Sequence, residues 1–299
     1  MKVILFASPE FTTTFLQRLL YSKEIEVVAV VTQPDKPVGR KQTITAPAIK
    51  VFAQEEGIPV LQPKNKKELA KQLEEYEADF FVVIAYGMIF TPKILEMPKY
   101  GCINVHFSLL PKYRGASPMQ ASLLNGDQET GISILKMDEE LDHGPIYILR
   151  KVRIEKEDNF EMLTKKLSEI GSVLLPATLF DIASQDLSPI TQSHQQASFC
   201  QKINKGDGEI DFNSKNAEEI HNMIRAYTPW PSSYCEYKGK KLKILEAEFE
   251  DNISLKPGEF KVEGKTLSIG TKKGVLIPKK LQPEGKKPMD VGSFINGLS

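Results

Sequence analysis

The sequence predicts an α/β fold in which a doubly wound, mostly parallel sheet is followed by a small OB-like β-barrel. Over the first two thirds of the chain, short apolar runs alternate with segments of helical periodicity, an order typical of parallel sheets with crossover helices. Several runs are apolar at every position, as strands buried on both faces are. The last third instead holds short β runs separated by glycine-containing turns.

The first four predicted strands are separated or followed by short helices. The strands are Lys2–Ala7, Glu26–Thr32, Asp79–Tyr86 and Gly101–His106, and the helices are Ala46–Glu56, Lys66–Glu74 and Ser117–Asn125. One more helix is expected to begin at Ser8-Pro9-Glu10, with Ser8 as the N-cap residue and Pro9 at the first helical position.

The rest of the chain divides into added strands, a long helix, a linker and a second domain. Added strands are predicted at Gly131–Met137 and Pro145–Ile154, a long helix at Asn159–Ser184 and an extended polar linker at Gln185–Gly208. A helix at Lys215–Tyr227 is followed by five strands at Ser232–Tyr237, Lys241–Glu248, Gly258–Val262, Thr266–Ile269 and Val275–Pro278. The predicted boundaries are 1–187 for the first domain, 188–207 for the linker and 208–299 for the second domain.

Charge is balanced overall but uneven along the chain. The 299 residues have a formal net charge of zero, so the molecule as a whole is not a general binder of polyanions. Four basic residues and no acid lie between Lys36 and Gln54, and eight lysines with two acids lie between Lys261 and Met289. Such zones indicate either solvated lysine-rich loops or specific contact with an anionic partner.

Several classes of protein are disfavoured by what the sequence lacks. Three widely spaced cysteines predict neither a disulfide framework nor a metal knuckle. The N-terminus begins at once with a strand, and no apolar run approaches the roughly 18 residues of a membrane span, so we expect a cytoplasmic protein. No G-x-G-x-x-G follows the first strand, which disfavours a nicotinamide-dependent dehydrogenase, and no P-loop, H-E-x-x-H or G-x-S-x-G motif is present.

The densest polar cluster combines an amide, an imidazole and a carboxylate. Asn104 and His106 alternate at the end of a predicted strand, so both side chains can face one site at the sheet edge where ligands bind. Asp142 follows in a polar loop. An amide N–H and an imidazolium can hold an oxyanion, and a carboxylate can accept a proton, so the set suits acyl transfer. From these residues alone, the more common interpretations are a hydrogen-bonded loop for Asn104 and His106 and a simple turn residue for Asp142.

The wider motif around these residues resembles the signature of the folate-dependent formyltransferases. Asn104-Val-His106-Phe-Ser108-Leu-Leu-Pro111 is followed by Tyr113-Arg114-Gly115 and, further on, by Leu141-Asp142-His143-Gly144. Four more segments are similar to the methionyl-tRNA formyltransferase family, namely Thr32–Arg40, Ala85–Ile89, Thr228–Pro231 and Leu281–Met289. The resemblance runs from Met1 to Ser299, in the order and spacing of the family.

The resemblance implies a Rossmann-like N-terminal domain that holds 10-formyltetrahydrofolate and an OB-type barrel that helps to hold initiator methionyl-tRNA. The formyl group of this reduced folate would pass to the α-amino group of the methionine, for translation initiation, without a metal. Asn104 and His106 would stabilise the tetrahedral oxyanion, while Asp142 would tune His106 and assist proton removal. We expect a monomer in the cytoplasm that has no contact with a membrane.

The resemblance also implies where the two substrates bind. The residues expected at the folate are Tyr86, Gly87, Met88, Ile89, Ser108, Leu109, Leu110, Pro111 and Asp138. Met88 and Ile89 are equally compatible with simple core packing. The basic loop Lys36–Lys50 corresponds to the family's insertion that contacts the tRNA acceptor end, and the residues expected there are Lys36, Arg40 and Lys41.

Two departures from the family pattern and two rival functions remain open. Phe107 stands where the family usually has a small residue, and it either narrows the pocket or points into the core. The turn at Ser8-Pro9 is one residue shorter than the usual one. The first rival is another folate enzyme with the same catalytic domain, acting on glycinamide ribonucleotide, an amino sugar or formyltetrahydrofolate itself. Of these, an enzyme with a nucleotide substrate would usually end near residue 200, before the predicted barrel. A non-enzymatic RNA-binding module would leave the Asn104, His106 and Asp142 set without a role.

Overall fold

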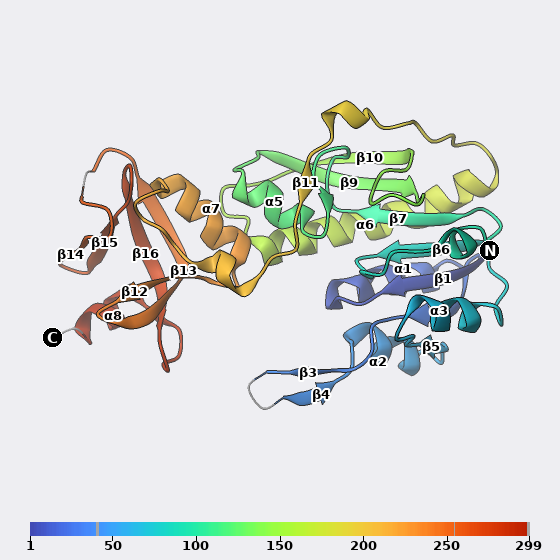
Figure 1. Ribbon diagram of the computed structural model, residues 1–299, viewed down its shortest axis with the longest axis horizontal. Helices are drawn as coiled ribbons and strands as arrows, with labels where there is room; N and C mark the ends of the chain where they lie inside the picture. Colours follow the sequence, from blue (N-terminus) through green and yellow to red (C-terminus); the bar gives the residue numbers. More distant parts are fainter. Residues whose placement is uncertain (40–41, 254, 298–299) are drawn as a thin grey trace. The chain divides into compact units, whose positions relative to one another are not determined.

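The computed structural model describes residues 1–39, 42–253 and 255–297. The chain divides into two compact units, each with its own β-sheet (Figure 1). The first unit consists of Met1–Pro118, Thr130–Arg153 and Thr164–Cys200, and the second of Met119–Glu129, Ile154–Leu163 and Gln201–Ser299.

A seven-stranded sheet forms the centre of the first unit, in the order β10, β9, β7, β6, β1, β2, β5 (Figure 1). The strands are β1 (Lys2–Ala7), β2 (Glu26–Val31), β5 (Val60–Leu61), β6 (Phe80–Ile84), β7 (Cys102–His106), β9 (Glu129–Lys136) and β10 (Ile146–Arg153). The strands from β7 to β5 are parallel, and β9 joins β7 in the antiparallel sense. The predicted mostly parallel α/β sheet is therefore confirmed.

Helices cover this sheet and bury its apolar side chains. They are α1 (Thr13–Tyr21), α2 (Ala48–Glu55), α3 (Lys66–Leu73), α4 (Pro92–Leu95) and α6 (Phe160–Ala183), the last of which belongs to this unit from Thr164 onward. One core cluster joins Phe6 of β1 and Phe81 of β6 to Leu69 of α3. A Cβ added at Gly171 of α6 would lie 3.0 Å from the ring of Phe15, so this glycine lets α6 approach α1. No helix among the described residues is long and apolar enough to cross a membrane.

The turn after β1 differs from the predicted helix start. A short 3-10 helix covers Glu10–Thr12, and α1 begins only at Thr13. The Ser8 hydroxyl does not cap this helix; it accepts hydrogen bonds from the Gln33 backbone N–H at 3.1 Å and from the Thr32 hydroxyl at 3.3 Å. Ser8 therefore links the carboxyl end of β1 to that of β2, a tertiary contact that the local N-cap pattern does not reveal.

Phe107, the residue that departs from the family pattern, points into the core. Its side chain is only 4% exposed. The ring packs edge-on against Phe11 at a centroid distance of 5.4 Å and against Phe15 at 6.2 Å. Such edge-to-face contacts add to the hydrophobic gain of burying an aromatic ring. Phe107 is therefore part of the packing between β7 and α1, and it does not narrow a pocket beside His106.

A β-hairpin that the sequence did not predict projects from the sheet after β2. It consists of β3 (Lys36–Val38) and β4 (Thr43–Thr45). At its base, Lys50 Nζ lies 2.9 Å from both carboxylate oxygens of Asp35, and Gln62 Nε2 donates to Asp35 Oδ1 at 2.7 Å. The hydrogen bond from Gln62 lowers the pKa of the Asp35 carboxyl most, and the hydrogen bond from Lys50 lowers it further. Lys50 is thus paired with an acid just outside the predicted basic zone and is not a free cation.

The second unit is built on a six-stranded antiparallel sheet, in the order β12, β13, β16, β15, β14, with β17 paired to β16. The strands are β12 (Ser233–Tyr237), β13 (Lys240–Glu250), β14 (Phe260–Glu263), β15 (Thr266–Gly270), β16 (Val275–Pro283) and β17 (Met289–Asp290). Its helices are α5 (Pro118–Leu124), α7 (Ala217–Tyr227), α8 (Val291–Asn296) and a 3-10 turn at Lys205–Gly208. A capping box of Asn216 and Glu219 begins α7. A separate C-terminal β domain was predicted, and this sheet confirms it.

Acidic side chains neutralise part of the lysine-rich zone in this sheet. Lys261 pairs with Glu263 at 2.7 Å. Lys279 pairs with Glu248 at 2.8 Å, and Lys280 pairs with Glu246 at 3.1 Å. The last two glutamates come from β13, which lies beside β16 in the sheet but outside the zone in the sequence. The net positive charge that the zone presents is therefore smaller than its composition indicates.

Candidate active site

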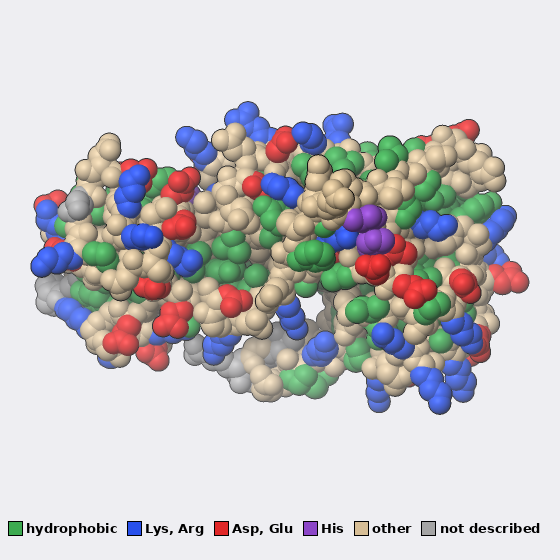
Figure 2. Space-filling model, turned by 45° about the horizontal axis from the view of Figure 1, so that its top comes forward, with side chains coloured by type: hydrophobic (Ala, Val, Ile, Leu, Met, Phe, Trp, Pro, Cys, Tyr) green, Lys and Arg blue, Asp and Glu red, His purple; other side chains and the backbone are tan. Residues whose placement is uncertain are grey.

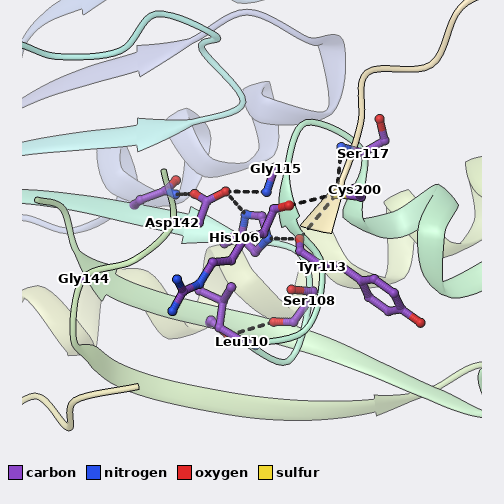
Figure 3. A network of polar contacts seen from close by, with 12 residues as sticks. His106, Ser108, Leu110, Tyr113, Gly115, Ser117, Asp142, Gly144 and Cys200 are labelled. Carbon is purple, nitrogen blue, oxygen red and sulfur yellow. Dashed lines mark hydrogen bonds and ion pairs between the residues drawn. The ribbon is translucent and has the colours of Figure 1, made fainter. Parts of the chain in front are cut away.

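The three predicted catalytic side chains lie together at the carboxyl end of β7. Figure 3 shows two of them, His106 and Asp142, close to each other. Asn104 and His106 are two positions apart on this strand, so both point to the same side. Asp142 comes from the loop between β9 and β10, and β9 pairs directly with β7. The Asn104 Nδ2 donates to Asp142 Oδ1 at 2.9 Å, and Asp142 Oδ2 lies 3.6 Å from His106 Nδ1.

The carboxylate of Asp142 is held from two sides. Its Oδ1 accepts from Asn104, and its Oδ2 accepts from the backbone N–H of Gly115 at 2.8 Å. The side chains of His106 and Asp142 are only 7% and 8% exposed. Charge-assisted hydrogen bonds in such a shielded place fix the orientation of the carboxylate and are stronger than those between neutral groups.

The orientation of the His106 ring follows from its second nitrogen. Its Nε2 lies 2.9 Å from the carbonyl oxygen of Tyr113. A carbonyl can only accept, so Nε2 carries a proton and donates it to this bond. The other nitrogen, Nδ1, faces Asp142 and is the atom through which the ring can gain or lose a proton.

The predicted folate-binding residues Ser108, Leu109, Leu110 and Pro111 form a tight loop after β7. The Ser108 hydroxyl donates to the Lys112 carbonyl at 2.6 Å. The Ser133 hydroxyl donates to the Ser108 carbonyl at 2.7 Å and accepts from the Leu110 N–H at 3.1 Å. These contacts shape the loop that carries Tyr113 and Gly115. Contact of the four residues with a folate stays a prediction.

The predicted folate-binding segment Tyr86–Ile89 offers mainly backbone. The Tyr86 side chain is 2% exposed and packs edge-on against Phe6 and Phe90, and burial raises its pKa to about 12. Met88 packs against the same core cluster, whereas Ile89 is 59% exposed. Gly87 has a φ of +82°, and no atom lies within 4 Å of the position its Cβ would take. The segment thus has open space along its backbone at the carboxyl end of β6.

Asp138, the last residue expected at the folate, is tied to its own loop. Its Oδ2 lies 2.7 Å from His143 Nδ1, and its Oδ1 accepts from the Glu140 N–H at 3.0 Å. The His143 ring stacks on His194 at a centroid distance of 4.0 Å and an interplanar angle of 9°. Figure 2 shows histidine side chains gathered at one point of the surface, next to acidic side chains.

Of the three residues expected to contact tRNA, the structure describes one. Lys36 is exposed at the start of β3, and its Nζ lies 3.3 Å from Gln33 Oε1. Arg40 and Lys41 lie outside the described residues.

The segment 192–200, here called the return segment, completes the site although it was expected to be part of a linker. Its β11 (Phe199–Cys200) pairs in parallel with β8 (Arg114–Gly115). A Cβ added at Gly115, whose φ is +123°, would collide with the carbonyl oxygen of Cys200. Only glycine therefore allows this close approach. In this position the Gly115 N–H donates a hydrogen bond to Asp142 Oδ2. The polar composition of the return segment gave no local signal of this contact.

Metal-ligating side chains do not gather within residues 1–39, 42–253 and 255–297: no three His, Cys, Asp or Glu residues there are placed to hold a metal ion. The three cysteines are free. Burial raises the pKa of Cys102 and of Cys235 to about 12, and it also raises the pKa of Cys200. All three are therefore thiols, and none is a reactive thiolate.

Solved structures share the fold of this chain. The N-formyltransferase from Helicobacter canadensis matches with a TM-score of 0.69, over 94% of this chain and 98% of the other, at 20% identity. A sugar N-formyltransferase from a Shewanella species matches with a TM-score of 0.62, over 82% of this chain and 96% of the other, at 19% identity. At such identities the likeness establishes the fold alone.

Sequence relatives define the family more closely. The model of the formyl transferase family matches residues 1–179, and that of the formyl transferase C-terminal domain matches residues 202–299. The methionyl-tRNA formyltransferase of Lachnospira eligens is 40% identical, over 99% of this chain and 96% of the relative. That of Listeria innocua is 42% identical, over 99% of this chain and 95% of the relative. Because the match extends over both domains at this identity, the chain belongs to the methionyl-tRNA formyltransferase family.

Proposed function

We propose that the chain transfers the formyl group of 10-formyltetrahydrofolate to the α-amino group of the methionine carried by initiator tRNA. The observation that carries the proposal is the convergence of Asn104, His106 and Asp142 at the carboxyl end of β7. Family membership over the full length supports the choice of methionyl-tRNA as acceptor. The reaction is acyl transfer to an amine, for which positioning and charge stabilisation are the main requirements.

Asn104 and His106 act on the formyl oxygen. Attack of the amine turns this oxygen into an oxyanion, which needs hydrogen-bond donors in place before the reaction. The Asn104 amide has two N–H groups, and its bond to Asp142 occupies one of them. The second can be directed to the oxyanion. Protonated at Nδ1, His106 supplies a positive charge beside the same oxygen.

Asp142 accepts the proton that the attacking amine loses. When the amine nitrogen bonds to the formyl carbon, it carries a proton that must leave before the tetrahedral species can break down. The Asp142 carboxylate, whose Oδ2 lies 3.6 Å from His106 Nδ1, accepts this proton. Cleavage of the bond between the formyl carbon and N10 of the folate then returns a proton to N10, so the transfer consumes no external acid or base.

The folate site is proposed along the backbone of Tyr86–Ile89, with Asp138 and the Ser108–Pro111 loop as its other parts. The open space at Gly87 and the exposed side chain of Ile89 suit a flat heterocycle that hydrogen-bonds to backbone groups. The Helicobacter canadensis N-formyltransferase was crystallised with folinic acid, a reduced folate. This supports a folate as formyl donor and leaves each contact to be tested.

The tRNA site is proposed on the β3–β4 hairpin, with Lys36, Arg40 and Lys41 as its basic residues. Lys36 is exposed, and the Asp35, Lys50 and Gln62 bonds fix the base from which the hairpin extends. A positive hairpin can bind the phosphates of an acceptor stem. We also expect the protein to act as a monomer in the cytoplasm, where initiator tRNA is charged.

The experiment that tests the function is a formylation assay with purified protein, 10-formyltetrahydrofolate and methionyl-tRNA, in the presence of a chelator. We expect formyl-methionyl-tRNA to accumulate with many turnovers per enzyme molecule. Amino-sugar nucleotides and glycinamide ribonucleotide serve as alternative acceptors. Turnover with one of these and none with methionyl-tRNA would refute the assigned acceptor, and dependence on added metal would refute the metal-free mechanism.

The hairpin is tested by Lys36→Ala. Removing one phosphate contact should raise KM for methionyl-tRNA and reduce the salt dependence of tRNA binding by about one unit of log–log slope. Folate affinity should not change. The matched control is Lys66→Ala, an exposed lysine at the start of α3. Equal effects of the two substitutions would argue against a tRNA site on the hairpin.

A further inference from the structure

Gln192, in the return segment, makes direct contact with the backbone of the Asp142 loop. It is only 6% exposed. Its Nε2 donates to the carbonyl oxygen of Asp142 at 2.9 Å and to that of Gly144 at 2.7 Å. One side-chain amide thus holds the loop on both sides of His143.

The backbone that Gln192 holds is in an unusual conformation. Asp142 has a φ of +50°, in the left-handed region that residues with a Cβ rarely adopt. Such a conformation persists only where surrounding contacts enforce it, and these cases cluster at functional sites. With this backbone, the Asp142 carboxylate reaches Asn104, the Gly115 N–H and His106. A relaxed backbone would direct the carboxylate elsewhere.

The other end of the Gln192 amide is fixed as well. Its Oε1 accepts from Arg114 Nη2 at 2.7 Å and from Arg114 Nε at 3.2 Å. Because a guanidinium only donates and the two loop carbonyls only accept, the amide has a single orientation that satisfies every contact. Arg114 is itself 4% exposed and lies at the start of β8, between Tyr113 and Gly115.

Arg114 also connects to the surface histidine pair. Its Nη2 donates to His194 Nδ1 at 2.9 Å, and the His194 ring stacks on His143. His143 is bonded in turn to Asp138, at the start of the Asp142 loop. The return segment therefore contacts this loop twice, through Gln192 at Asp142 and Gly144 and through His194 at His143, which is itself bonded to Asp138 at the start of the loop.

We propose that Gln192 is a positioning residue for the reaction: it sets the left-handed backbone of Asp142 and thereby aims the carboxylate at Asn104 and His106. The inference rests on the proposed role of Asp142 in formyl transfer. Gln192 is only 6% exposed, and its side chain is bonded to the loop and to Arg114, so it acts through the loop. Its loss should accordingly slow the chemical step and leave substrate binding largely intact.

Two substitutions test this role. Gln192→Met keeps the length of the side chain and removes all four hydrogen bonds, while Gln192→Glu keeps the acceptor for Arg114 but has no proton for the loop carbonyls. We expect both to lower kcat by about 10- to 100-fold, because small misplacement of a reacting group has effects of this size. KM for methionyl-tRNA and the Kd of a folate analogue should change less than about threefold. The control is Gln195→Met, at an exposed position of the same segment.

A double-mutant cycle separates positioning from general stability. If Gln192 acts through Asp142, Gln192→Met should lower kcat by less than about twofold in an Asp142→Asn background, although it lowers kcat strongly in the wild-type background. The same factor in both backgrounds would overturn the proposal. A wild-type kcat in Gln192→Glu would also overturn the proposal. This second variant keeps the test valid if Gln192→Met does not fold.

A readout without substrate keeps this inference separate from the proposed function. Amide hydrogen exchange in residues 138–145 should be faster in Gln192→Met than in the wild type and in Gln195→Met. If the wild type fails to formylate methionyl-tRNA, the proposed function is wrong, and the exchange result alone decides whether Gln192 holds the loop. Unchanged exchange in Gln192→Met would show that it does not.

Discussion

Asp142→Asn is the substitution that tests the arrangement of the site most directly. The side chain keeps its shape, but one carboxylate oxygen becomes an NH2 group. In the native site, Oδ1 accepts from Asn104 at 2.9 Å and Oδ2 accepts from the Gly115 N–H at 2.8 Å. The Gly115 N–H can only donate, so the remaining oxygen must stay on that side. The new NH2 group then faces the Asn104 amide, which must turn over to accept from it.

The consequences of this substitution can be worked out from these contacts. Turning the Asn104 amide redirects the N–H groups that should meet the oxyanion. The negative charge 3.6 Å from His106 Nδ1 is lost, together with the proton acceptor. A charge-assisted hydrogen bond is worth about 1.5–3 kcal/mol, and general-base assistance contributes about 100- to 10,000-fold. We expect kcat to fall by about 100- to 10,000-fold. KM for methionyl-tRNA should change less than about threefold.

Single-turnover formylation at saturating substrate measures this effect on the chemical step. Glu140→Gln, in the same loop with a side chain 74% exposed, is the matched control for a loss of negative charge. Thermal unfolding should show that Asp142→Asn is folded at the assay temperature. A fall in kcat of less than about tenfold, or a loss of tRNA affinity as large as the loss in rate, would refute the assigned role.

Three further predictions concern the surroundings of the site and the second unit. Phe107→Ala should reduce the free energy of unfolding in urea by about 3–5 kcal/mol, because it empties a packed aromatic position, and a loss below about 1 kcal/mol would contradict its place in the core. Gly115→Ala should lower kcat by about 100-fold, because its Cβ would collide with the Cys200 carbonyl and displace the N–H from Asp142; an unchanged kcat would show that the approach is not tight. Burial lowers the pKa of His221 to about 4, below its ordinary value of 6.5. Between pH 4 and 6.5 the unfolded chain therefore binds more protons than the folded chain, so the free energy of unfolding rises with pH across this interval. In urea titrations, His221→Gln should make the free energy of unfolding less dependent on pH between these values. The same pH dependence in the variant and the wild type would contradict the low pKa of His221.

The central strands could be predicted because their signal is local. β1, β2, β6 and β7 are short apolar runs, and each lies within about two residues of its predicted range. The β3–β4 hairpin was missed because its strands have only three residues each and one contains a proline. At its base lies the Asp35 and Lys50 pair, two residues 15 positions apart in the chain, and such a contact has no local signal.

The return segment shows why a site is harder to predict than its strands. Gln192 reaches Asp142 across 50 residues, and Ser198 reaches Tyr113 across 85. Its sequence is polar and lacks periodicity, so composition favours a linker. The contacts form because β11 pairs with the short strand β8 next to the site. This pairing joins residues that are far apart in the sequence, so no local pattern indicates it.

By itself, the sequence determined the central strands β1, β2, β6 and β7 and, through its motifs, the family and the candidate residues Asn104, His106 and Asp142. Periodicity among neighbouring residues suffices for the strands, and the motifs along the chain suffice for the family resemblance. The tertiary structure alone decided that Phe107 belongs to the core, that Lys50 is neutralised by Asp35, and that Gln192 and Gly115 hold Asp142. These outcomes depend on which distant groups meet, and the pairing of buried polar groups is settled only when the whole chain has packed.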